Sequence, residues 1–137
     1  MCGCLSHLFS FAFFGGSERL PPGEYNITTS SGESEIALTQ HLKQVGAKMY
    51  GAFWCPHCQE QKQLFGQEAV AQLNYIECDP EGQNAQPEVC KAKGIQGLPT
   101  WEIKGKFYEG TKSLEELANL SSYQGDRNFR NTLSNGQ

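Results

Sequence analysis

Residues 49–65 of the chain read MYGAFWCPHCQEQKQLF. The first six are apolar and aromatic and predict a buried β-strand, whereas residues 59–65 have a helix-forming composition. Cys55 and Cys58 therefore lie where a strand gives way to a helix. A helix N-terminus collects unpaired N–H groups and the positive end of the macrodipole, which favours the reactive thiolate form of the first cysteine. The stretch predicts a redox-active pair, in which Cys55 and Cys58 form and break a disulfide bond with each other.

The composition excludes several functions. A length of 137 residues allows one domain with its own core. The net charge is -4 and the 11 Lys and Arg residues are scattered, so we expect no nucleic acid as a partner. The 6 cysteines are many for a cytosolic protein of this size, but too few and too unevenly placed for a disulfide-rich miniprotein.

The two ends of the chain differ from its middle. The apolar run within residues 1–16 is too short to span a membrane. It fits an atypical signal or membrane-associating segment, the stump of a longer membrane-attached chain, or an unstructured leader in which Cys2 and Cys4 are spectators. Residues 17–33 are rich in Pro, Gly, Ser and Thr and predict a flexible linker. We therefore expect a leader and linker over residues 1–33, a domain over 34–124, and a polar, disordered tail over 125–137.

Periodicity and turn residues predict the elements of the domain. Apolar residues from Ile36 to Val45 have helical spacing, and Gly46 is suited to end that helix. Ser113 and Glu116 form a capping box that begins the last helix. Strand, helix and strand followed by a hairpin and a helix indicate an α/β fold, a three-layer sandwich whose mixed central sheet has helices on both faces. The expected order is helix 34–45, strand 48–53, helix 56–66, helix 67–72, strand 73–77, helix 87–93, strands 100–103 and 106–108, and a final helix from 114.

These elements resemble the thioredoxin fold family in three places. The motif WCPHC, residues 54–58, lies at the strand–helix junction, GLPT, residues 97–100, directly precedes the hairpin, and an amphipathic helix closes the domain. The resemblance implies a cis peptide bond before Pro99, which would face the redox pair. It also implies that the Leu98 backbone pairs with an extended substrate.

Residues 34–125 look more closely like the thioredoxin-like domain fused to bacterial and plant homologues of vitamin K epoxide reductase. The phrases YGAFWCPHC (50–58), YIEC (75–78) and GIQGLPTW (94–101) carry this resemblance. It implies a place in the periplasm or thylakoid lumen and electron exchange with a quinone-linked membrane partner, which we expect to be a separate chain. It also implies a structural disulfide between Cys78 and Cys90. A second redox pair at these cysteines, and a cytoplasmic location, stay open as alternatives.

Reactivity assigns roles around the dithiol. Cys55, at the helix N-terminus, is the expected nucleophile, and Cys58, one turn further in, would attack the mixed disulfide and release the substrate. His57 resembles the Pro-His dipeptide of strongly oxidising periplasmic enzymes, where an imidazolium stabilises the thiolate; the alternative is an exposed helix residue without a role. The expected substrate-binding residues are Trp54, Pro56, Leu98 and Pro99.

The dithiol itself carries the electrons, so we expect no dissociable cofactor. A zinc site made of four cysteines is the alternative, but Cys78 and Cys90 lack the close spacing of a metal knuckle, and we expect no metal.

One residue departs from the family pattern. Thioredoxins have a buried Asp or Glu six residues before the first cysteine, where it relays the proton of the inner thiol, and here that residue is Met49. Lys48 and Glu102 are weak candidates to replace it.

We predict a thiol-disulfide oxidoreductase that acts on protein cysteines, with a non-catalytic client-binding or chaperone module as the alternative.

Overall fold

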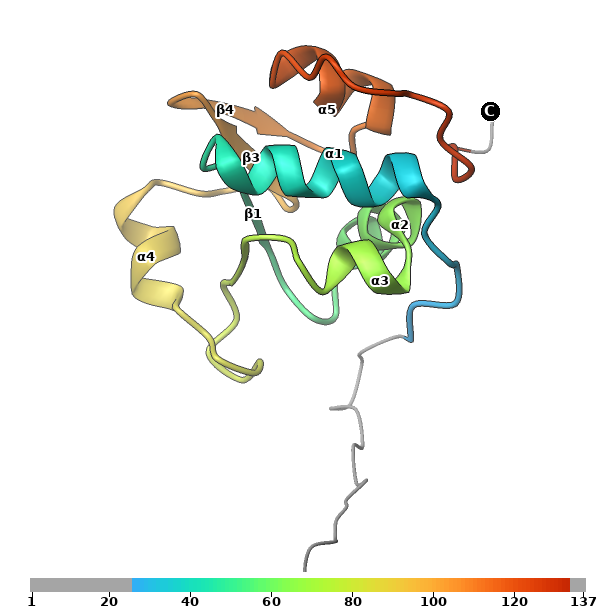
Figure 1. Ribbon diagram of the computed structural model, residues 1–137. Helices are drawn as coiled ribbons and strands as arrows, with labels where there is room; N and C mark the ends of the chain where they lie inside the picture. The colour runs from blue at the N-terminus through green and yellow to red at the C-terminus, as the bar shows by residue number, and fades with distance from the viewer. Residues whose placement is uncertain (1–25, 134–137) are drawn as a thin grey trace, which may run out of the picture.

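The structure, a computed structural model, describes residues 26–133 and is built around one mixed sheet in the order β2-β1-β3-β4 (Figure 1). β1 (Lys48–Gly51) pairs in parallel with β2 (Tyr75–Glu77) and antiparallel with β3 (Thr100–Ile103). β3 forms a hairpin with β4 (Lys106–Glu109). The predicted α/β fold with a mixed sheet is confirmed. The leader, with Cys2 and Cys4, lies outside the described residues.

The predicted helices are present, and most differences concern where elements end. β1 stops at Gly51, before the predicted end at residue 53, because the chain turns there and the Cys55 N–H donates to the Ala52 carbonyl (3.1 Å). Gly46 has a φ of 76°, a conformation that glycine adopts more easily than other residues. The first helix ends just before it, as expected. The helices of residues 26–133 are α1 (Glu33–Gln44), α2 (Pro56–Phe65), α3 (Gln67–Val70), α4 (Pro87–Ala92) and α5 (Leu114–Leu120).

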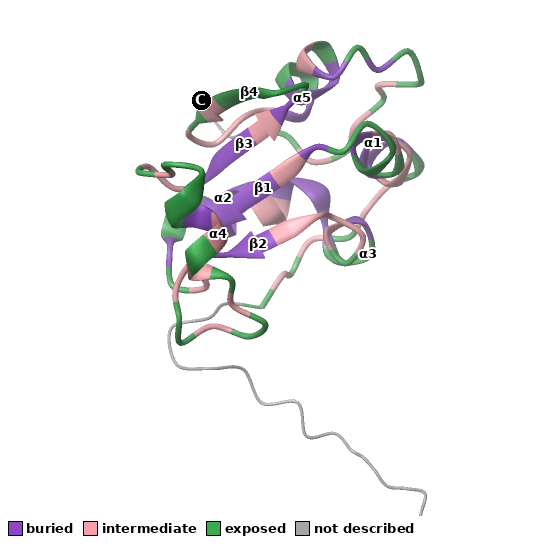
Figure 2. Ribbon diagram, turned by 90° about the vertical axis from the view of Figure 1, so that its left-hand side faces the viewer, coloured by how far each residue is buried: buried purple, intermediate pink, exposed green. Residues whose placement is uncertain are grey.

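The alternation of side chains along β1 divides the interior into two cores. Met49 faces the larger core, which it shares with Trp101 of β3 and with side chains of α1, α2 and α5. Tyr50 faces the opposite side and packs with Ile76 and Cys90. α4 accordingly lies on one side of the sheet, and α1 and α3 lie on the other (Figures 1 and 2). Helices on both faces of a buried sheet make the three-layer sandwich that the element order predicts.

The buried face of α1 is more polar than its sequence suggests. Val45, which the helical spacing places on the apolar face, is 36% exposed. Glu35 is instead fully buried, and its carboxylate accepts hydrogen bonds from the Gly32, Arg130 and Asn131 N–H groups at 3.0, 2.7 and 2.9 Å. This carboxylate stays buried because backbone donors take the place of water around it.

Segments next to the expected domain pack onto it, so residues 26–33 and 125–133 differ from the predicted linker and disordered tail. The Thr29 hydroxyl donates to the Gln63 carbonyl (2.6 Å), and the Ser31 hydroxyl donates to the Phe65 carbonyl (2.7 Å). These bonds fix residues 26–33 against the end of α2. Because backbone carbonyls accept these hydrogen bonds, the residue types in the sequence do not predict them.

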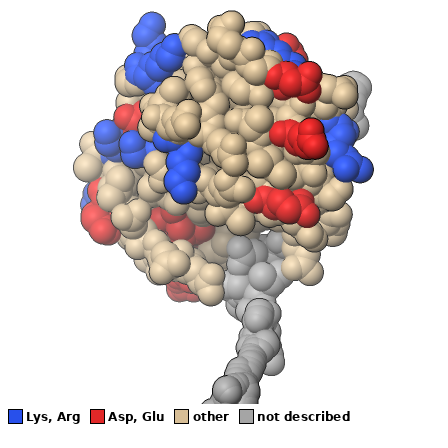
Figure 3. Space-filling model, in the orientation of Figure 1, with Lys and Arg blue, Asp and Glu red and all other residues tan. Residues whose placement is uncertain are grey.

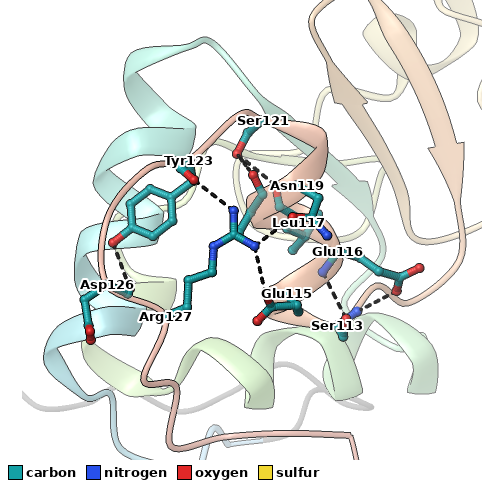
Figure 4. A network of polar contacts seen from close by, with 10 residues as sticks. Ser113, Glu115, Glu116, Leu117, Asn119, Ser121, Tyr123, Asp126 and Arg127 are labelled. Carbon is teal, nitrogen blue, oxygen red and sulfur yellow. Dashed lines mark hydrogen bonds and ion pairs between the residues drawn. The ribbon is translucent and has the colours of Figure 1, made fainter.

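The described part of the tail is held by α1 and α5. Figure 4 shows Arg127 reaching the Glu115 carboxylate and the Asn119 side chain, both at 2.7 Å, and the Tyr123 carbonyl at 2.9 Å. Phe129 packs against the larger core. Polar composition alone predicts disorder here, but one arginine with three acceptors and one aromatic ring attach the segment to the domain.

The surface carries charges of both signs. On the face shown in Figure 3, Lys and Arg side chains are interspersed with Asp and Glu over a largely uncharged background. Within residues 26–133, no helix is both long enough and apolar enough to cross a membrane.

We predict that Glu35→Ala lowers the free energy of unfolding by about 2 to 3 kcal/mol, because three backbone N–H groups lose a charged acceptor. Urea denaturation followed by circular dichroism measures this change. Glu33→Ala is the matched control, since Glu33 lies in the same first turn but is exposed. Equal effects of the two variants would contradict the role assigned to Glu35.

Candidate functional site

Cys55 is the residue that caps the N-terminus of α2. It has extended backbone angles (φ -81°, ψ 119°), and Pro56 follows at the first helical position, where a missing N–H is harmless. The Cys58 N–H donates to the Cys55 Sγ at 3.3 Å. The N-terminus of α2 thus offers a backbone N–H donor to the Cys55 sulfur, at the strand–helix junction that the sequence predicted.

The two sulfurs are unequally placed, and both are free thiols. Cys55 retains 5% exposure at the surface, whereas Cys58 is completely buried in the larger core. Burial, together with the neighbouring Cys55, raises the pKa of the Cys58 thiol well above its ordinary value, and the charge of Lys62 opposes this rise. The geometry agrees with the predicted order, in which Cys55 is the outer sulfur and Cys58 the inner one.

The turn before β3 covers the outer sulfur. The Leu98–Pro99 peptide bond is cis, as the resemblance implied, and the Cys55 Sγ lies 3.8 Å from the Leu98 carbonyl oxygen. Pro99 is buried, and its own carbonyl accepts from the Gly110 N–H at 2.8 Å. Residues far apart in the sequence, in the WCPHC and GLPT motifs, thus meet at one place.

Trp54 forms the exposed rim of the site. Its ring is 48% exposed, and its Nε1–H donates to the Asp79 carboxylate at 2.6 Å. The bond from the Glu81 N–H, together with this bond from Trp54, holds the pKa of Asp79 below its usual value. The ring is thus held in place at the surface beside Cys55, and substrate binding by Trp54 stays a prediction.

His57 lies in the first turn of α2, with its side chain 74% exposed. Its Nδ1 is 3.6 Å from a Glu60 carboxylate oxygen, and its carbonyl accepts from the Thr111 hydroxyl at 3.1 Å. The imidazole is thus near a carboxylate of its own helix. A direct effect of His57 on Cys55 stays a prediction.

Cys78 and Cys90 are joined by a disulfide, the pairing that the resemblance implied. The bond attaches α4 to the end of β2, and Cys90 packs against Tyr50 and Ile76 in the smaller core. The four-thiolate zinc alternative therefore lacks two of its ligands. No group of three or more His, Cys, Asp and Glu residues within the described chain is arranged to hold a metal ion.

The two weak candidates for a proton relay lie on the wrong side of the sheet. Met49 is fully buried in the core that contains Cys58. Lys48 and Glu102 are paired in register on β1 and β3, and the Glu102 carboxylate accepts from Tyr50 at 2.7 Å and from Lys93 at 3.3 Å. Because Tyr50 belongs to the core on the opposite face, this group of polar residues is separated from Cys58 by the sheet itself.

Sequence patterns did not single out Gln61, which is completely buried behind the site. Its side-chain oxygen accepts from the Trp101 indole N–H (2.9 Å) and the Lys112 N–H (2.8 Å), while its amide donates to the Lys112 carbonyl (2.9 Å). Gln61 thereby joins α2 to β3 and to the segment before α5. A polar residue in a helix is usually exposed, so only the tertiary structure reveals this role.

The sheet order, the cis proline beside Cys55 and the dithiol at the start of α2 define a thioredoxin-like domain. The chain is 45% identical over 115 residues to "Thiol-disulfide oxidoreductase LTO1" of Arabidopsis thaliana, across 82% of this chain and 31% of that protein. It is 30% identical over 121 residues to "Protein disulfide isomerase-like 2-2" of Oryza sativa subsp. japonica, across 74% of this chain and 31% of that protein.

The chain thus spans about a third of the length of these curated relatives. Among solved structures, oxidized glutaredoxin 2 from Chlamydomonas reinhardtii aligns with 63% of this chain and 82% of its own, at 22% identity and a TM-score of 0.34. No protein-family model matches the chain.

We predict that the double variant Cys78→Ala, Cys90→Ala loses about 3 kcal/mol of stability, because a disulfide between cysteines 12 residues apart restricts the unfolded chain. Urea denaturation without reductant measures the loss. Wild-type protein in excess dithiothreitol is a second reference and should approach the double variant. An unchanged unfolding midpoint would show that the bond does not stabilise the domain.

Proposed function

We propose that this chain is a thiol-disulfide oxidoreductase that exchanges disulfides with cysteines of other proteins. The observation that carries the proposal is the asymmetric dithiol. The Cys55 sulfur has a helix-terminal N–H donor at 3.3 Å and a carbonyl edge at 3.8 Å, while its partner Cys58 is buried one turn behind. The curated relatives named above support it, since both printed names are those of thiol-disulfide enzymes.

The exchange proceeds in two displacements. In the reducing direction, the Cys55 thiolate attacks a substrate disulfide, forms a mixed disulfide and releases one substrate thiolate. Cys58 then loses its proton and attacks the Cys55 sulfur, which forms the internal disulfide and releases the second thiolate. Two electrons pass from the dithiol to the substrate. The oxidising direction reverses these steps, and no dissociable cofactor takes part.

The substrate in this proposal is an extended, cysteine-bearing polypeptide. It lies along the backbone of Leu98, next to Pro99 and the Cys55 sulfur, and contacts the exposed rings of Trp54 and Pro56. Main-chain pairing at this edge would make the enzyme tolerant of substrate sequence. His57 would stabilise the Cys55 thiolate when its imidazole is protonated.

In this proposal, a quinone-linked membrane protein of the vitamin K epoxide reductase type returns the dithiol to its starting state. The process that the two proteins serve is disulfide formation on the extracytoplasmic side of a membrane. Two observations support this part. The chain carries the phrases that resemble the corresponding fused domain, and its Cys78–Cys90 disulfide suits an oxidising compartment such as the periplasm or thylakoid lumen.

The experiment is to trap the partner. Cys58→Ala should leave Cys55 able to attack but unable to release the client, so mixed disulfides accumulate and run as higher bands on non-reducing gels. Their identity follows from mass spectrometry. The control Cys55→Ser should trap nothing and should lose dithiol–disulfide turnover. Turnover by Cys55→Ser at the wild-type rate would contradict the proposal, and so would an absence of adducts with Cys58→Ala.

A further inference from the structure

The buried position of Cys58 poses a chemical problem. In the proposed function its thiol must lose a proton before it attacks, and burial opposes the charged form. The place where a carboxylate would take that proton is occupied by Met49, and Glu102 lies across the sheet. The proton must therefore leave by another route on the Cys58 side of the sheet.

A gap at Gly51 brings Cys58 close to Tyr75 of the neighbouring strand. A Cβ atom at Gly51 would lie 2.9 Å from the Cys58 Sγ and 3.2 Å from the Tyr75 hydroxyl oxygen. The sulfur and the phenol therefore border the same small space, which glycine leaves open. Any larger residue at this position would separate the two groups.

Behind Tyr75 lies a buried carboxylate. The Tyr75 hydroxyl donates to Glu77 Oε1 at 2.9 Å, and the other oxygen of Glu77 accepts from the Phe53 and Asp79 N–H groups, both at 3.1 Å. Glu77 is only 4% exposed. Since its carboxylate is fixed by two backbone donors, it holds the phenol of Tyr75 in one orientation.

Lys62 supplies a cation on the same side. It lies one turn after Cys58 on α2, and its Nζ is 4.0 Å from the centre of the Tyr75 ring. Its charge favours the thiolate of Cys58. A cavity of about 240 Å³ adjoins these groups and is lined by Phe53, Lys62, Tyr75, Glu77, Gln83 and Asn84.

We propose that the proton of Cys58 reaches this cavity through Tyr75, with Tyr75 as the group that takes the proton beside the sulfur, Glu77 as the carboxylate that orients Tyr75 and takes its hydroxyl proton, and Lys62 as the cation that stabilises the thiolate. The inference rests on the proposed function. The proton passes from the Cys58 Sγ to the Tyr75 hydroxyl oxygen, while the hydroxyl proton passes to Glu77 Oε1. Glu77 then gives the proton to water in the cavity that it lines, and the Cys58 thiolate attacks the Cys55 sulfur. The S–S bond forms as the bond to the substrate sulfur breaks, and the departing thiolate takes a proton from solvent.

The charges around Cys58 come from two elements. Cys55 and Lys62 act on it from α2, and Tyr75 and Glu77 come from β2, while β1 contributes Met49 and Gly51, which do not titrate. Lys62 is thus the cation on the Cys58 side of the sheet. Removing its charge should directly raise the pKa of the Cys58 thiol.

Stopped-flow reaction of the reduced protein with a limiting amount of an aromatic disulfide that releases a coloured thiolate separates the two steps. The first, concentration-dependent phase reports attack by Cys55. The second, concentration-independent phase reports attack by Cys58 on the mixed disulfide. We expect Lys62→Met and Tyr75→Phe to slow the second phase by about tenfold at neutral pH, the effect of one unit of pKa, and to leave the first unchanged. The pH profile of the second phase should move to higher pH in Lys62→Met, because losing the cation raises the pKa of Cys58.

Matched variants control for structural effects. Tyr50→Phe removes the same kind of hydroxyl, bonded to Glu102 on the opposite face at 2.7 Å, and should leave both phases unchanged. Lys62→Arg keeps the charge and should restore the second phase. The inference is overturned if Lys62→Met and Tyr75→Phe leave the second phase within about twofold of wild type, or if Tyr50→Phe slows it equally. A wild-type protein that shows no first phase would instead overturn the proposed function.

Discussion

The hydrogen bond from the Cys58 N–H to the Cys55 sulfur is the interaction on which the site depends. It forms because α2 begins at Pro56, immediately after the turn that ends β1. The same geometry places one sulfur at the helix N-terminus and the other, a turn later, in the core beneath the sheet. The helix-terminal position of Cys55 and the burial of Cys58 are therefore two consequences of one constraint. A dithiol on a free helix surface would have the first property without the second.

The central sheet separates two kinds of polar chemistry. On the dithiol side, Tyr75, Glu77 and Lys62 line a cavity, and Tyr75 and Cys58 border the same space beside Gly51. On the other side, Tyr50 and Glu102 form a second tyrosine–carboxylate pair over the smaller core. The Cys78–Cys90 disulfide links these regions, because Cys78 follows β2 directly and the next residue, Asp79, holds the Trp54 ring at the rim of the site. A bond distant from the reacting sulfurs thus helps to fix a surface that a substrate would contact.

Much of the fold could be predicted because it follows from local patterns. The capping box at Ser113 and the hairpin of β3 and β4 each depend on a few neighbouring residues, and the structure contains both. The contact between Cys55 and the Leu98–Pro99 turn could be predicted only from the family resemblance. Residues some forty positions apart have no local sequence pattern that indicates a contact. The burial of Glu35 escaped prediction because backbone N–H groups donate to its carboxylate. The attachment of residues 125–133 escaped it because it depends on tertiary contacts of Arg127 and Phe129. The environment of Cys58 escaped prediction for a related reason. The Tyr75 ring approaches Gly51 because β1 and β2 pair Met49 with Tyr75 and Gly51 with Glu77, and this register is a tertiary property.

The reduction potential of the Cys55–Cys58 pair tests the central claim most directly. It is measured by equilibrating the protein with mixtures of reduced and oxidised glutathione and determining the fraction of dithiol. A pair that exchanges disulfides with client proteins should have a potential between about -270 and -120 mV, the span from thioredoxin to strongly oxidising enzymes. A potential below about -300 mV, typical of permanent structural disulfides, would contradict a catalytic role for the pair and favour a domain that binds clients without turnover.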